Sequence, residues 1–135
     1  MKYDYTTYLP AENGKFIKRS MIEIEIYGPN GAHKQLALVD SGADKSLFHI
    51  EIAKVLGISL SQGKKYVVTG ITGQSEEILT EVEIKPKHLG SIKIPVGFID
   101  SPYVGVLLGQ EGFFDKHRIK FEKDHNVFEI SPVSK

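Results

Sequence analysis

The chain has 135 residues, a length typical of a single domain. Lys plus Arg and Asp plus Glu each number 17, so the formal net charge is zero, which argues against a strongly basic nucleic-acid-binding protein. The absence of cysteine excludes disulfides, thiolate metal ligands and cysteine nucleophiles. The sequence shows neither an apolar signal segment nor a membrane span, so we expect a cytoplasmic protein with a packed core.

The first half of the chain predicts an arm followed by a hairpin. Residues 1–19 lack hydrophobic periodicity, which predicts an irregular N-terminal arm. Residues 21–27 alternate isoleucine with polar residues, a pattern typical of a strand with one buried face. The turn at 28–31 contains Asn-Gly, so we expect the strand at 35–40 to fold back antiparallel on the first.

The remaining elements indicate an all-β protein with little helix. Apolar residues spaced three or four apart over 46–56, followed by Gly57, predict a short helix. Two glycines and several hydroxyl side chains at 69–75 predict a hairpin tip. Further strands are predicted at 76–85, 92–99, 105–108, 117–122 and 127–130. This spacing of short strands favours a β-barrel or sandwich.

Two motifs in the chain suggest chemistry. Asp40 ends an apolar strand and is followed by Ser41 and Gly42, a turn with little side-chain bulk beside the carboxylate. An Asp-Ser-Gly triplet alone is weak evidence, because it arises by chance on the order of once in twenty chains of this length. The second motif is the apolar pair and glycine Leu107-Leu108-Gly109. The order and spacing of the two motifs are more specific than either one.

Together these motifs resemble the retropepsin-like aspartic proteases, the single-domain family of the retroviral proteases and their cellular and bacterial relatives. The resemblance covers roughly residues 20–130, and residues 68–75 match the glycine-containing flap of the family in position and length. It implies a retropepsin-like closed β-barrel with one or two short helices over residues 20–131, followed by a C-terminal tail at 132–135. Each subunit would carry half of the active site.

The resemblance also implies a role for each residue of the first motif. Asp40 would be the catalytic carboxylate, Ser41 would hydrogen-bond across a two-fold axis, and Gly42 would let the substrate backbone approach. Ala43 and Asp44 would contact the substrate, Asp44 by accepting hydrogen bonds from an extended peptide. The implied flap residues, which would close over the substrate, are Gly70, Ile71, Thr72 and Gly73. The residues that would brace the catalytic loop are Leu107, Leu108 and Gly109.

The same resemblance implies a homodimer. Aspartic proteases use two carboxylates that share a proton and hold a water, because like charges about 3 Å apart cannot both ionise. The chain has one such motif, so activity requires Asp40 from two subunits to meet on a two-fold axis. The substrate would be a polypeptide bound as an added strand in a shared cleft. No metal or other cofactor is needed, and we expect neither nucleic acid nor membrane as a partner.

Two positions depart from the pattern of the viral members. Gln110 stands where an arginine would pair with the carboxylate of Asp44, so this carboxylate would turn to Lys45 or Arg118 instead. Pro132 cannot donate to the strand ladder that interleaved termini form in viral dimers. The dimer interface would then be built differently, with the Tyr-rich arm as one candidate.

Other interpretations remain open from the sequence. Asp40 could form an Asx turn onto Gly42, and Asp44 could cap the helix predicted at 46–56 or lie in its first turn. The fold could also serve as a non-catalytic dimerisation or peptide-binding module, or as a domain that processes only a linked polypeptide. The five histidines show no metal-ligand spacing and are expected to be exposed: His33, His49, His88, His117 and His125.

Overall fold

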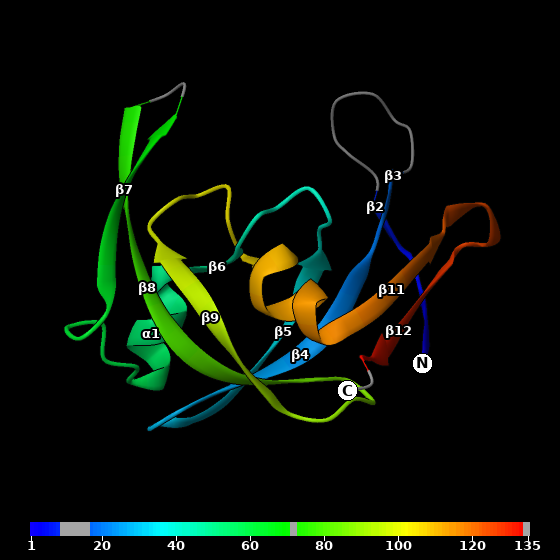
Figure 1. The fold of residues 1–135 in the computed structure, drawn as a ribbon, viewed down its shortest axis with the longest axis horizontal. Helices are drawn as coiled ribbons and strands as arrows, with labels where there is room; N and C mark the ends of the chain where they lie inside the picture. The colour runs from blue at the N-terminus through cyan, green and yellow to red at the C-terminus, as the bar shows by residue number, and fades with distance from the viewer. Residues whose placement is uncertain (9–16, 71–72, 134–135) are drawn as a thin grey trace.

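The computed structural model describes residues 1–8, 17–70 and 73–133 and shows a closed β-barrel with few helices (Figure 1). Strands make up most of the residues that the structure describes, so the prediction of an all-β barrel is confirmed. None of the helices in the described ranges is long and apolar enough to cross a membrane.

The elements follow one another in a simple chain order. The strands are β1 (Lys2–Asp4), β2 (Thr6–Tyr8), β3 (Ile17–Arg19), β4 (Met21–Gly28), β5 (Gly31–Val39), β6 (Ser46–His49), β7 (Lys64–Gly70), β8 (Gly73–Pro86), β9 (Ile92–Ile99), β10 (Val106–Leu108), β11 (His117–Glu122) and β12 (Val127–Pro132). The helical elements are α1 (Ile50–Leu56), the irregular turn η1 (Gln110–Phe114) and the short 3-10 turn η2 (Lys123–His125).

Six strands close the barrel in the order β4-β5-β10-β6-β9-β8, and β8 pairs again with β4. β7 extends this sheet beyond β8 as the hairpin that rises at the left of Figure 1. Most neighbours are antiparallel, but β10 runs parallel to β5 and β6 runs parallel to β9. β10 therefore lies between β5 and β6, the two strands that the loop at residues 40–45 connects.

The predicted hairpin of β4 and β5 is confirmed. Gly28 and Gly31 face each other at its tip, and the register runs from there to the pair Met21 and Leu38. The alternation of β4 places Ile22, Ile24 and Ile26 in the core, where each is at most 2% exposed. The isoleucine face therefore fixes which side of the strand is buried.

The helix predicted at 46–56 begins later, at Ile50. Residues 46–49 form β6, in which Ser46 and Phe48 face the core with 0% exposure. Phe48 fits both the strand pattern and the helix pattern: it alternates with its neighbours in β6, and it precedes the buried Ile52 by four residues. Gly57 ends the helix in the left-handed conformation with φ 69°, as its position predicted.

The N-terminal arm is ordered where the structure describes it, contrary to the expectation of an irregular segment. β1 pairs with β12, which pairs with β11, and β2 pairs with β3. Tyr3 and Tyr5 pack on the fully buried Phe128, each with ring centroids 5.4 Å apart. Packing against a distant strand fixes the extended backbone here, so local periodicity could not reveal it.

Candidate active site

Asp40 follows β5, and its loop projects from the same side of the barrel as the β7–β8 hairpin (Figure 1). The backbone N–H of Asp40 donates to the carbonyl of Leu108 at 2.9 Å, and the N–H of Gly42 donates to Asp40 Oδ1 at 2.9 Å. Asp40 is half-buried, whereas Ser41 and Gly42 are exposed. The turn thus presents a carboxylate with one oxygen fixed by a backbone donor. The Asx turn of Asp40 onto Gly42, one of the alternatives that the sequence left open, is present. This turn leaves the second carboxylate oxygen unused, so it is compatible with a catalytic role.

The second motif lies directly beside the first. Leu107 and Leu108 of β10 pair in parallel with Leu38 and Val39, the residues that precede Asp40. On its other side β10 pairs antiparallel with β6, which begins just after the loop. Leu108 is fully buried. The loop that carries Asp40 therefore starts and ends on strands that β10 holds together.

Gly109 allows the chain to pass close beneath this loop. A Cβ atom at this position would lie 2.6 Å from the carbonyl oxygen of Ala43 and 2.7 Å from the carbonyl carbon of Lys45. The N–H of Gly109 also donates to the hydroxyl of the buried Ser46 at 3.1 Å. Only glycine fits such a close approach between two backbone segments.

The residues after Gly109 hold the loop by its carbonyl groups. Gln110 donates its backbone N–H to the carbonyl of Ala43 at 2.8 Å, and its side-chain Nε2 donates to the carbonyl of Ser41 at 2.8 Å. The N–H of Glu111 donates to the carbonyl of Asp44 at 3.0 Å. The glutamine therefore contributes to the site through the loop backbone, which an arginine-carboxylate pair would not do.

Asp44 is exposed, and the described residues show none of its three expected contacts, with the helix terminus, Lys45 or Arg118. The helix begins at Ile50 with His49 as its cap, so Asp44 does not cap it. Among the described residues Asp44 makes no ion pair: Lys45 binds Glu77 instead, and Arg118 is exposed on β11. The expectation that Asp44 pairs with Lys45 or Arg118 was wrong, because a buried acid attracts Lys45 more strongly than an exposed one.

The flap residues are described only in part. Gly70 ends β7 and Gly73 begins β8, and the two face each other in the hairpin register. Ile71 and Thr72 lie outside the described residues. The structure thus shows a β-hairpin at the position of the expected flap.

One hollow is lined by Asp40, and a second hollow shares two residues with it. One, of about 300 Å³, is lined by Tyr5, Lys18, Arg19, Ser20, Leu38, Val39, Asp40, Ser41, Phe121 and Lys123. The other, of about 480 Å³, shares Arg19 and Leu38 with it and continues along Met21, Leu36 and Leu107. The first hollow is bordered by three cationic side chains, and the second is lined mainly by aliphatic ones.

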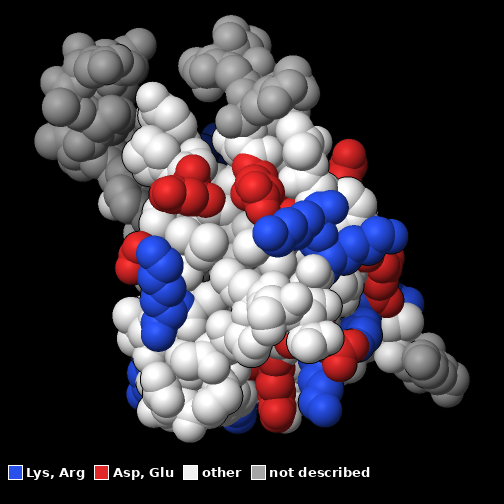
Figure 2. Space-filling model, turned by 90° about the vertical axis from the view of Figure 1, so that its left-hand side faces the viewer, with Lys and Arg blue, Asp and Glu red and all other residues white. Residues whose placement is uncertain are grey.

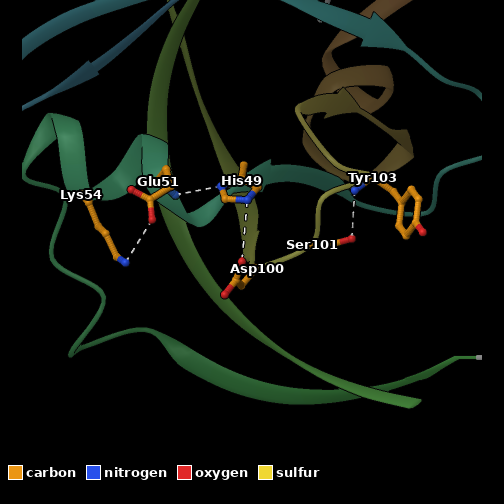
Figure 3. Close-up of polar contacts among 6 residues, drawn as sticks. All are labelled: His49, Glu51, Lys54, Asp100, Ser101 and Tyr103. Carbon is orange, nitrogen blue, oxygen red and sulfur yellow. Dashed lines mark hydrogen bonds and ion pairs between the residues drawn. The ribbon is translucent and has the colours of Figure 1, made fainter. Parts of the chain in front are cut away.

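Contacts around His49 position the segment that leads into β10 (Figure 3). His49 Nδ1 accepts the N–H of Glu51 at 3.1 Å, and His49 Nε2 lies 3.8 Å from Asp100 Oδ1. The N–H of Tyr103 donates to Ser101 Oγ at 3.3 Å within the same segment. The N–H of His49 also donates to the carbonyl of Gly105, immediately before β10. The cap of α1 is thereby tied to β10, the strand that holds the Asp40 loop.

Two buried ionisable residues were not anticipated. His117 is 5% exposed, stacks on Phe113 at 4.5 Å between ring centroids, and its Nδ1 lies 3.0 Å from the Phe113 carbonyl. Burial lowers the pKa of His117 below its ordinary value, so the expectation of an exposed histidine was wrong here. Glu77 is also buried, and its place next to Glu76 gave no sign of this.

The described surface shown in Figure 2 carries positive and negative side chains mixed together, without a large patch of one sign. Figure 2 shows lysine and arginine side chains interspersed with aspartate and glutamate on one face of the molecule. Within residues 1–8, 17–70 and 73–133, no three His, Asp or Glu side chains gather into a metal-binding group.

No family model matches the chain, and no curated protein matches its sequence.

Proposed function

We propose that the protein is a retropepsin-like aspartic endopeptidase that works as a homodimer. The observation that carries the proposal is the placement of Asp40: a carboxylate at the end of a barrel strand, in an Asp-Ser-Gly turn held by β10 and by the hydrogen bonds of Gln110 and Glu111. Such a support fixes a side chain that must meet a second carboxylate with little room for error.

The chemistry follows from a pair of Asp40 carboxylates. One subunit supplies one carboxylate, and the second copy supplies the other across a two-fold axis. The ionised member removes a proton from a water held between them, and the protonated member donates to the scissile carbonyl oxygen. The pair titrates as a unit, and no covalent intermediate forms. Ser41 of each subunit would bond to the loop of the other and fix the separation of the carboxylates.

A peptide would lie as an extended strand between the catalytic loop and the β7–β8 hairpin. Ala43 and Asp44 lie at the loop side of this path, and Gly70 and Gly73 lie at the hairpin. The aliphatic hollow along Leu38 and Leu107 lies on β5 and β10, the strands that hold the Asp40 loop, and its lining suits an apolar side chain.

The Asx turn of Asp40 favours one alternative, a non-catalytic dimerisation or peptide-binding module. Here Oδ1 of Asp40 would serve only to shape the loop by accepting the N–H of Gly42. The same fold and the same peptide path would then be kept without hydrolysis.

The test is digestion of an unbiased peptide library between about pH 4 and 7, the range in which a carboxylate pair changes its protonation. Wild type is compared with Asp40→Asn and with the control Asp124→Asn, whose side chain is 80% exposed on η2. We expect cleavage by wild type and the control, and none by Asp40→Asn, with all three shown to be dimers by sedimentation. A folded wild-type dimer that cleaves nothing supports the binding module instead.

A further inference from the structure

One side chain connects the catalytic loop to the hairpin. Lys45 follows Asp44, and its Nζ lies 3.4 Å from Glu77 Oε1 on β8. The same Nζ lies 4.4 Å from the centroid of the Tyr66 ring on β7. Tyr66 and Glu77 face each other in the register of the two strands, near the base of the hairpin. A single lysine thus contacts both arms of the hairpin from the neighbouring loop.

Glu77 is built into the protein rather than resting on its surface. Its side chain is 5% exposed, whereas that of Lys45 is 36% exposed. Gly97 on β9 provides the space, since a Cβ atom there would lie 2.6 Å from Glu77 Cδ. A carboxylate buried to this degree is strongly unfavourable without a charged hydrogen-bonding partner, and Lys45 is the partner that the structure provides.

We propose that Lys45, Glu77 and Tyr66 form a latch that couples the loop of Asp40 and Asp44 to the base of the β7–β8 hairpin. Lys45 and Glu77 are positioning residues in this arrangement: they set how the two walls of the peptide path lie relative to each other. The coupling itself follows from the contacts, and its role in peptide binding rests on the proposed function.

The latch predicts an asymmetric response to mutation. Lys45→Met leaves Glu77 buried without its cation, so it disturbs the hairpin strongly. Glu77→Gln leaves Lys45 partly exposed to water and keeps a hydrogen-bond acceptor, so it disturbs the structure less. The double variant removes both charges together and should recover much of what Lys45→Met loses.

The hairpin contains its own control pair. Lys65 Nζ and Glu76 Oε1 lie 3.5 Å apart across β7 and β8, as a diagonal pair whose members each precede Tyr66 or Glu77 by one residue. Their side chains are 69% and 58% exposed, and the pair joins the two arms of the hairpin only. Lys65→Met and Glu76→Gln therefore make the same chemical changes without touching the catalytic loop.

The experiment is amide hydrogen exchange of the full-length protein, followed by mass spectrometry of peptides covering residues 40–45, 64–67 and 75–79. We expect Lys45→Met to accelerate exchange in the hairpin base roughly five- to thirtyfold, the factor that one or two kcal/mol produces, and Glu77→Gln to accelerate exchange in the loop by a smaller factor. The Lys65 and Glu76 variants should leave the loop unchanged. The latch is refuted if each variant accelerates exchange only in its own segment, or if the Lys65 and Glu76 variants accelerate exchange in the loop as much as Glu77→Gln does. If Lys45→Met fails to fold, exchange in the loop of Glu77→Gln is sufficient for the test.

Peptide hydrolysis provides a separate readout. If wild type cleaves peptides, Glu77→Gln should raise KM several-fold with a smaller change in kcat, because Glu77 positions the peptide path and does not touch the reacting atoms. A loss confined to kcat would contradict the positioning role. Coupled exchange in a protein that cleaves nothing would uphold the latch and overturn the proposed function.

Discussion

Gly109→Ala is the substitution that best tests how the Asp40 loop is held. The new Cβ would lie 2.6 Å from the Ala43 carbonyl oxygen and 2.7 Å from the Lys45 carbonyl carbon, so both overlaps involve backbone. No side-chain rotation can relieve them, and the loop is pinned by the hydrogen bonds of Gln110 and Glu111. Overpacking of this kind costs about 1–3 kcal/mol, and we expect the upper end.

Urea denaturation at a fixed protein concentration measures the effect. We expect Gly109→Ala to lower the unfolding free energy by about 3 kcal/mol, equivalent to a melting temperature lower by roughly 10 °C in a domain of this size. Gly90→Ala is the control, because no atom lies within 4 Å of a Cβ at Gly90. If the two variants agree within about 0.5 kcal/mol, the scatter expected for surface substitutions, the close approach does not constrain the loop.

Two further substitutions test the packing around the site. Burial lowers the pKa of His117, so the unfolded chain takes up a proton that the native state refuses; stability should therefore fall as pH drops below about 6.5 and level off below the lowered native pKa. Urea midpoints at several pH values should show this loss in wild type and a smaller one in His117→Gln, and equal slopes would contradict it. Phe128→Ala should cost about 3–5 kcal/mol, because Tyr3 and Tyr5 pack on this ring. A loss below about 1 kcal/mol, well under the range for a core phenylalanine, would mean that the β1-β12-β11 sheet is not part of the core.

The sequence predicted those elements whose signal is local. The strands at 92–99 and 117–122 have the predicted bounds, because each is a run of alternating apolar and other residues with turn residues on either side. Gly57 ended its helix as predicted, because a left-handed cap depends on one residue. The strand β6 was assigned to helix, since four residues are too few to separate a period of two from one of 3.6.

The sequence predicted which residues belong to the candidate site, but not the buried contacts that surround them. The motif placed Asp40 and Gly109 in the sequence, and the structure brings their segments together through β10. The burial of Glu77 could not be foreseen, because it depends on the missing Cβ of Gly97 on another strand. Lys45 likewise carries no local sign that it reaches the hairpin. Contacts of this kind depend on tertiary packing that no periodicity encodes.

The insertion of β10 between β5 and β6 has a consequence for folding. β5 and β6 are close in the chain, yet each pairs with a strand that comes much later. Pairing distant segments requires closing a long loop, and the entropy of loop closure is lost before the new contacts form. This order of events slows folding. A nascent chain that ends before Val106 contains Asp40 but lacks the strand and the glycine that hold its loop. The loop of Asp40 therefore gains its support only after the segment from Val106 to Gly109 has been synthesised and has inserted between β5 and β6.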